Sequence, residues 1–357
     1  MKFFLPAFVI GAALNLLVFF PEVGLAIYPE FTSSIEDIER IAPSVFIQDD
    51  SSAFSFKTSS ALIHLKRNGV IEDTIPMSGL EGVSGDGRYY IRYAKVGSEI
   101  EFYGMQGRFW KQKSREYPYL SYSGRLIFLL NGDQSAVRII NYDGNEIGVK
   151  TIAGRVCSVI VFAVRGDYGG AGFVDGSFQA VGPDGSLIAS GVVSAGGMVK
   201  SMAVSDNGRF IAVHGGDVKS DHIGIFHTEN GSMYEYPLAY THISKTALHI
   251  SDDGRLVVLD KGALLFLDKK AGLDFSITVD EKRDGHASIK EGDFAYAVGY
   301  TTKQGISKFL IITKKGKTIY KRDFPGESFL DVTLDGSLIF LRGSDNLYCY
   351  SLHGRAE

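Results

Sequence analysis

The sequence has very little tryptophan, cysteine and proline, with one Trp, two Cys and nine Pro in 357 residues. Two cysteines cannot supply a disulfide framework, so the fold must be held by a hydrophobic core. At 45% hydrophobic residues, the chain has ample material for one. A basic stripe is also missing, because the formal net charge is −4 and both signs are mixed along the chain. The sequence therefore predicts no nucleic-acid partner, since such binding depends on clustered Lys and Arg.

Local signatures of enzymes are absent as well. The chain contains no P-loop, no paired C-x-x-C and no H-E-x-x-H. The G-x-S-x-G nucleophile elbow is missing too, because Gly82-Val83-Ser84-Gly85 is followed by Asp86. The sequence therefore favours a protein without catalytic activity.

A long apolar run occurs at the N-terminus. Lys2 precedes an uncharged stretch at residues 3–20, Pro21 ends it, and small residues follow at Gly24 and Ala26. This order is typical of a secretory signal peptide. We predict that residues 1–26 are removed and that the protein is exported to a periplasmic or extracellular location, without membrane insertion after cleavage. The alternative is a retained membrane anchor, although a run of this length barely spans a bilayer.

Glycine and aromatic residues are plentiful, with 42 Gly, 24 Phe and 18 Tyr, as expected for short strands joined by tight turns. The stretch SDNGRFIAV at 205–213 returns 46 residues later as SDDGRLVVL at 251–259. Glycine turns of this kind recur every 37 to 46 residues, at Gly87, Gly124, Gly166, Gly208, Gly254, Gly292 and Gly336. A second series lies between them, at Gly69, Gly107, Gly144, Gly185, Gly231, Gly272, Gly316 and Gly354. Two turns per period predict four short antiparallel strands, here called A to D.

A four-stranded sheet of this size cannot cover its own faces, so successive sheets must stack, and a closed ring leaves no sheet exposed. The sequence thus predicts an all-β protein, a β-propeller over residues 42–357. Counting Asp49-Asp50 as the first turn gives eight blades. The last blade lacks strand D, which residues 27–31 can supply, followed by a short helix over residues 33–41. The N-terminal segment 27–41 would then close the ring. A seven-bladed ring with a mixed closing blade is the alternative.

The S-x-[DN]-G-R turn followed by an apolar strand resembles the repeats of WD40-like (TolB-type) β-propellers, in degenerate form, over residues 42–357. The S-x-[DN]-G-R turns lack the Pro of that signature, and the recurring GH and WD dipeptides of WD40 repeats are missing, since the chain has a single GH, at Gly285-His286, and no WD. The resemblance therefore implies the fold and no particular functional family. The single Trp110 also argues against a quinone-cofactor dehydrogenase, whose propellers use Trp repeats to brace the blades.

The two cysteines fall in different blades of this arrangement. Cys157 is expected in the inner strand of blade 4 and Cys349 in the third strand of blade 8, on opposite sides of the ring. A disulfide requires Cα atoms within about 7 Å. We therefore expect two separate buried thiols.

Function is expected on the face that carries the B–C and D–A loops, because these loops are longer and chemically richer than the glycine turns of the other face. Basic residues from five blades could form an anion-binding ring there, namely Arg115, Arg155, His242, Arg283 and Arg342. A second candidate is a metal site for calcium or zinc at Asp217, Asp221 and His222.

These observations predict an exported, monomeric, non-catalytic scaffold that needs no cofactor. It would bind a protein, peptide or glycan through its loop-rich face. The alternative is a metal-dependent, lactonase-like hydrolase with its site at the central channel, because acidic ligands scattered singly over the blades would leave no local motif.

Overall fold

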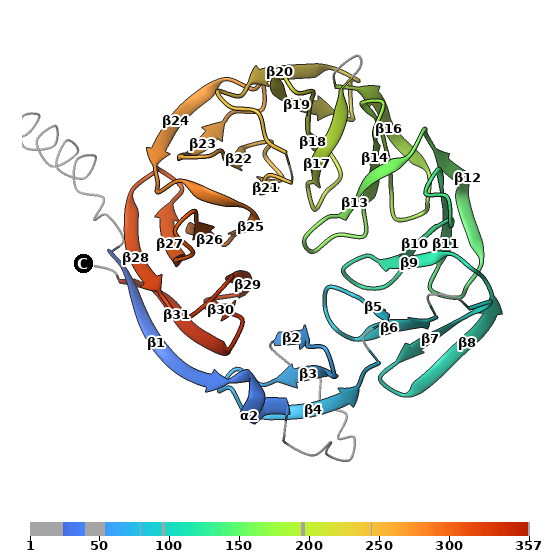
Figure 1. The fold of residues 1–357 in the computed structure, drawn as a ribbon, viewed down its shortest axis with the longest axis horizontal. Helices are drawn as coiled ribbons and strands as arrows, with labels where there is room; N and C mark the ends of the chain where they lie inside the picture. The colour runs from blue at the N-terminus through green and yellow to red at the C-terminus, as the bar shows by residue number, and fades with distance from the viewer. Residues whose placement is uncertain are drawn as a thin grey trace, which may run out of the picture.

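The computed structural model describes residues 24–39, 54–78, 80–94, 97–193, 197–243 and 245–355. The sheets lie radially around a central axis and close into a ring (Figure 1). There are eight sheets, seven of four strands and one that shows three strands within the described residues. The prediction of an all-β, eight-bladed propeller is confirmed, and the seven-bladed alternative is wrong.

The strands follow the chain outward within each blade. The first four blades are formed by β2 (Phe54–Lys57), β3 (Ala61–Leu65) and β4 (Ile71–Pro76); β5 (Glu81–Val83), β6 (Tyr89–Tyr93), β7 (Glu99–Gly104) and β8 (Gly107–Lys113); β9 (Tyr117–Leu120), β10 (Leu126–Leu130), β11 (Ala136–Asn141) and β12 (Glu146–Ala153); and β13 (Cys157–Phe162), β14 (Gly169–Phe173), β15 (Ser177–Val181) and β16 (Leu187–Val192).

The last four blades continue the same order until the final position. They are formed by β17 (Met198–Val204), β18 (Phe210–Gly216), β19 (Asp221–His227) and β20 (Met233–Pro237); β21 (Leu248–Ile250), β22 (Leu256–Leu259), β23 (Ala263–Leu267) and β24 (Leu273–Thr278); β25 (Lys282–Glu291), β26 (Ala295–Thr302), β27 (Ser307–Thr313) and β28 (Thr318–Phe324); and β29 (Asp331–Asp335), β30 (Leu338–Arg342), β31 (Asn346–Arg355) and β1 (Gly24–Ser34).

The repeated turn has a chemical reason for each of its residues. In the second blade the Ser84 hydroxyl accepts the amide of Tyr89 at 3.0 Å and donates to Asp86 at 2.6 Å. Gly87 has φ +73°, a conformation that side chains with a Cβ rarely adopt. The same residues that made the motif visible in the sequence therefore close the A–B hairpin.

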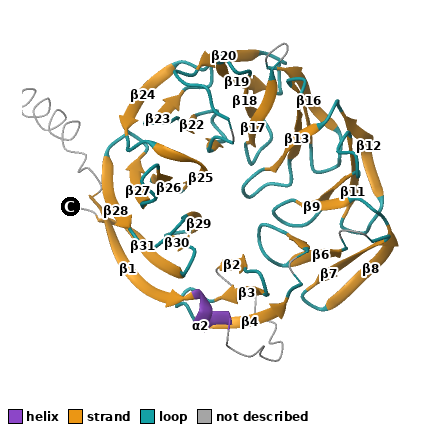
Figure 2. Ribbon diagram, viewed as in Figure 1, coloured by secondary structure: helices purple, strands orange, loops and turns teal. Residues whose placement is uncertain are grey.

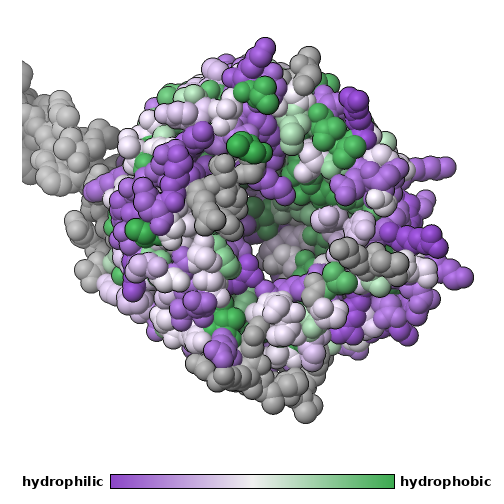
Figure 3. Space-filling view, in the orientation of Figure 1, coloured by the Kyte–Doolittle hydropathy of each residue, from purple (hydrophilic) through white to green (hydrophobic). Residues whose placement is uncertain are grey.

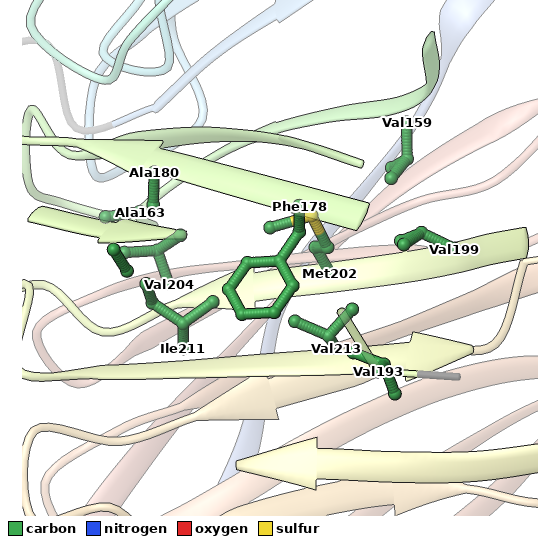
Figure 4. Close-up of a cluster of buried hydrophobic side chains, with 11 residues drawn as sticks. Val159, Ala163, Phe178, Ala180, Val193, Val199, Met202, Val204, Ile211 and Val213 are labelled. Carbon is green, nitrogen blue, oxygen red and sulfur yellow. The ribbon is translucent and has the colours of Figure 1, made fainter. Parts of the chain in front are cut away.

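Apolar side chains fill the space between neighbouring blades. Figure 4 shows one cluster, in which Phe178 of β15 lies among Val199 and Met202 of β17 and Val213 of β18. Phe178 is fully buried, and burying a side chain of this size contributes about 2 kcal/mol. The core is thus a series of layers between blades, with each blade covering the apolar face of the next.

Strand β1 closes the ring as the outermost strand of blade 8. It pairs antiparallel with β31, with Ile27 opposite Leu352 and Phe31 opposite Cys349. The predicted closure is confirmed, although β1 also extends to Gly24, three residues before the expected cleavage site. The helix α2 (Ile35–Glu39) follows β1 and is shorter than predicted. It is the single helix within the described residues (Figure 2). No helix in this part of the chain is long and apolar enough to cross a lipid bilayer.

Some predictions fall on residues outside the described ranges. These are residues 1–23 of the predicted signal peptide (residues 1–26), the Asp49-Asp50 turn and the inner strand of blade 1 expected before that turn. The cysteines are described: Cys157 lies in β13, Cys349 lies in β31, and both are buried and unpaired. Burial raises the pKa of the Cys349 thiol to about 12, so this thiol stays protonated and unreactive.

Candidate functional site

A buried group of charged and polar residues holds two loops together on the loop-rich face of blades 5 and 6. We call it the Lys200 network, and its members are Lys200, His214, Asp221, His242 and Asp260, all buried. The ammonium group of Lys200 donates to the Asp221 carboxylate at 2.5 Å and to the backbone carbonyl of His242 at 2.8 Å. Lys200 belongs to the inner strand β17, whose sequence MVKSMAV is mainly apolar. One side chain thus anchors strand β19 and the D–A loop that follows blade 5.

Asp221 is the centre of the network. Its second carboxylate oxygen accepts from His214 Nε2 at 2.9 Å and from the backbone amide of His242 at 2.8 Å. Burial by itself would raise the pKa of Asp221, but the hydrogen bonds from His214, Lys200 and the His242 amide lower it to about 2. Asp221 is therefore ionised at neutral pH and balances the charge of Lys200.

His242 extends the network into blade 6. Its Nε2 lies 2.7 Å from Asp260, at the end of β22, and its ring packs edge-on against His214 with centroids 5.5 Å apart. The pKa of His214 is lowered by burial, so this ring is neutral at neutral pH. His242 consequently ties the D–A loop to Asp221 of blade 5 through its backbone amide and to Asp260 of blade 6 through its ring.

Exposed apolar side chains lie on the two loops that this network fixes and at the adjoining start of β17. We call them the apolar rim: Met198, Val218, Tyr240 and Ile243. Val218 is 91% exposed, Ile243 92%, Tyr240 53% and Met198 37%. They are close together, since Val218 and Ile243 directly follow Asp217 and His242, whose carbonyls both accept from Lys200. Met198 pairs with Gly216 at the start of the same B–C loop. Figure 3 shows apolar residues at the surface of the ring, among hydrophilic ones and around a central opening.

The charged side chains beside the apolar rim include the exposed carboxylate of Asp217 as well as two lysines. Lys219 and Lys245 are exposed, and neither makes an ion pair with a described residue. Lys245 also lines a cavity of about 340 Å³ in the wall of the channel, together with Tyr117 and Tyr119 of β9. This end of the channel therefore combines apolar, aromatic and cationic groups within one area.

The residues predicted for a metal site do not converge. Asp217 accepts from the amides of Lys219 and Ser220 in its own loop, at 2.7 and 2.9 Å. The Asp221 carboxylate is occupied as described above, and His222, the next residue in β19, points to the opposite face of the sheet. Among the described residues no three His, Cys, Asp or Glu side chains are placed to hold a metal ion together. The hydrolase alternative stays a prediction that elemental analysis of the purified protein would test.

The residues predicted for an anion-binding ring occupy different environments. Arg115 and Arg155 are exposed, whereas His242 is buried against Asp260. Arg342 is half-buried, donates to the carbonyl of Lys57 at 2.8 Å and lies over the ring of Phe329. Arg283 lies near the start of β25. The structure does unite two residues from the separate candidate sets, because the His242 amide donates to Asp221.

Sequence reasoning missed Lys200 and Asp260, and it gave no role to Val218 or Ile243. Lys200 had a detectable signal, because a charged residue in the inner strand of a propeller blade must find a buried partner. The partners themselves are 21 residues away, at Asp221, and 42 residues away, at His242. No local pattern links residues so far apart.

Comparisons with known proteins relate the chain to others through its fold. No protein-family model matches it, and no curated protein matches its sequence. Similar solved structures include the C-terminal WD40 domain of Sif2, at a TM-score of 0.56 and 11% identity, covering 87% of this chain and 100% of that one. Hsv2 of Kluyvelomyces marxianus has a TM-score of 0.52 and 12% identity over 75% of this chain and 94% of that one. A chain of the mitotic checkpoint complex has a TM-score of 0.51 and 12% identity, over 76% and 86%.

The molecule is therefore an eight-bladed β-propeller that shares its architecture with WD40 repeat structures. At these identities the similarity concerns the fold alone. What this propeller does must be argued from its own surface.

Proposed function

We propose that this protein is an exported binding scaffold whose partner is another protein, and that the partner docks on the apolar rim. The observation that carries the proposal is the exposure of Val218 and Ile243 on two adjoining loops. Side chains of this kind are costly to leave in water, and grouped apolar residues with a polar surround are typical of interaction sites. The nearby lysines Lys219 and Lys245 favour a partner segment in which acidic residues flank apolar ones.

The Lys200 network supports this proposal through rigidity. Loops that are ordered before binding do not lose that conformational freedom when the partner docks, so more of the contact energy appears as affinity. Asp221 and Lys200 hold the two loops from their buried side, while Val218 and Ile243 are exposed to solvent. A buried ion pair adds little net stability, because removing both charges from water costs about as much as their attraction returns. Its better-attested role is to favour one structural arrangement, here that of the two loops.

The test is affinity capture from the exported fraction with three forms of the protein. The double variant Val218→Asp with Ile243→Asp should lose the partner, because each change places a negative charge in the centre of the contact. The control is Phe294→Asp, since Phe294 is 55% exposed at an A–B turn on the other face. The proposal is supported if wild type and control both retain a protein that the double variant does not. Cross-linking should then show that this partner makes contact through a segment with apolar and acidic residues.

Two results would contradict it. One is equal recovery of the same proteins with all three forms. The other is selective binding to a glycan array that the double variant retains, which would indicate a carbohydrate ligand at another place.

Export is a separate part of the proposal and has its own test. Cleavage after Ala26 would remove three residues of β1 and leave Ile27 to Ser34 paired with β31. N-terminal sequencing of the protein from the exported fraction should begin at Ile27. A sequence that begins at Met1 would instead indicate a retained N-terminal segment.

A further inference from the structure

The other end of the central channel contains a cavity that neither the proposed function nor the candidate sites above include. Its volume is about 550 Å³, within the range of small-molecule sites. It lies at the A–B turns, and the charged residues of its lining come from blades 2, 4, 7 and 8: Asp86, Arg88, Arg165, Lys290, Glu291 and Asp335. The lining thus contains both carboxylates and cations. The charge that an entering ligand meets depends on which of these groups already have a partner in the protein.

Two of the carboxylates are held by residues of their own surroundings. Asp86 accepts from the Ser84 hydroxyl at 2.6 Å and from the amide of Arg88 at 3.0 Å, as part of its turn. Asp335 lies 3.5 Å from the guanidinium of Arg67. Asp335 thus has a cationic partner, whereas the partners of Asp86 are neutral donors that fix the position of its carboxylate.

The third carboxylate is also satisfied. Glu291 lies 2.9 Å from Nε2 of His249 and forms an ion pair with Lys314. Burial lowers the pKa of Lys314 to about 8, so this lysine is largely protonated at neutral pH and its charge is matched by Glu291. The local charge of this group is therefore balanced without Lys290.

Lys290 makes no hydrogen bond or ion pair with any described residue. It extends from the inner strand β25, and desolvation lowers its pKa, with the positive charge of Arg165 acting in the same direction. Two carboxylates, Asp331 and Asp206, act against this shift, but neither forms an ion pair with Lys290: Asp331 lies 3.7 Å from Arg342, and Asp206 accepts the backbone amide of Arg165 at 2.7 Å. An ammonium group in this position gains from any anion that enters.

Arg165 approaches the same space from the opposite side of the ring. Its side chain crosses from blade 4 to blade 8, where one guanidinium nitrogen donates to the carbonyl of Leu334 at 3.3 Å. No described carboxylate forms an ion pair with it. Because a guanidinium has five N–H donors, most of them remain available.

We propose that this cavity is a binding site for a small oxyanion, held between the ammonium group of Lys290 and the guanidinium of Arg165. The ligand would be a phosphate-bearing or carboxylate-bearing small molecule. A lysine and a guanidinium that face one space from blades 7 and 4, neither of them in an ion pair with a described residue, form a site that an anion completes. The site lies on the face opposite the apolar rim, so it does not depend on the proposed protein partner.

The experiment is calorimetric titration of the purified protein with inorganic phosphate, pyrophosphate and citrate at constant ionic strength. We expect saturable binding of one anion per chain. Lys290→Gln and Arg165→Gln should each weaken binding by about tenfold or more, the usual effect of losing a charge-assisted hydrogen bond. Binding of pyrophosphate alone would identify a phosphate ligand, and comparable binding of citrate would extend the site to carboxylates.

The matched control is Lys245→Gln, which removes the same charge from an exposed lysine at the other end of the channel. It should leave the affinity unchanged. Thermal melts of each variant establish that it is folded before titration. The proposal is overturned if none of the three anions binds saturably to wild type, or if Lys245→Gln weakens binding as much as Lys290→Gln does.

Discussion

At the scale of single residues, the structure depends on a few buried charges with complete sets of partners. Asp221 accepts from Lys200, His214 and the His242 amide, and without the carboxylate Lys200 would keep only backbone carbonyls as acceptors. Removing one member of a buried ion pair is costly because the other charge remains buried. The network is therefore a place where one small substitution has a large effect.

Asp221→Asn is expected to destabilise the protein by about 3 kcal/mol, because it leaves the ammonium group of Lys200 without a counter-charge. Urea unfolding monitored by circular dichroism measures the change. Asp217→Asn is the control, since Asp217 is exposed and its hydrogen bonds within the loop can be kept by an amide oxygen. Its effect should stay within about 0.5 kcal/mol. Equal effects of the two substitutions would contradict the role assigned to Asp221.

The low pKa of Asp221 makes its contribution dependent on pH. The pKa is about 2 in the folded protein and 3.8 for an ordinary Asp, so the folded state favours the ionised form. The corresponding stability, about 2 kcal/mol, is present above pH 4 and is lost as the pH falls towards 2. The stability difference between wild type and Asp221→Asn should therefore shrink over this interval. A difference that stays constant from pH 6 to the acid end would show that the carboxylate is not ionised in the network.

At the scale of elements, strand β1 carries the closure of the ring. It covers the edge of β31, and Phe31 lies close to Gly69 of blade 1 and to Phe340 of blade 8, with the two Phe ring centroids 6.5 Å apart. Without β1, the backbone of β31 would be an open edge, and exposed edges promote association between chains. The strand thus connects the first blade to the last and prevents edge pairing.

A chain that begins at Ile35 should therefore melt at a lower temperature than one that begins at Ile27, and it should elute partly as larger species in size-exclusion chromatography. The chain from Ile27 is the matched control, because it keeps the register from Ile27 to Ser34. If both chains melt at the same temperature and elute as monomers, β1 does not close the ring in solution.

At the scale of the whole molecule, the sequence predicts what local chemistry determines. Gly87 and Gly208 occur in turns whose Ser, Asp and Asn side chains bond their own backbone, so the hairpins and the blade count were predictable. The network could not be predicted, because Lys200, His242 and Asp260 meet only after two blades have stacked. The predicted metal site shows a related difficulty, since Asp221 and His222 are adjacent in sequence while a strand places their side chains on two faces.

The central claim is that partners reach this propeller through the apolar rim of blades 5 and 6. Site-specific photo-cross-linking tests it most directly, with the photoreactive residue at position 243 in one form and at position 294, on the opposite face, in another. The account predicts a cross-linked protein from position 243 and none from position 294. Cross-links from position 294 alone, or equally from both positions, would contradict it.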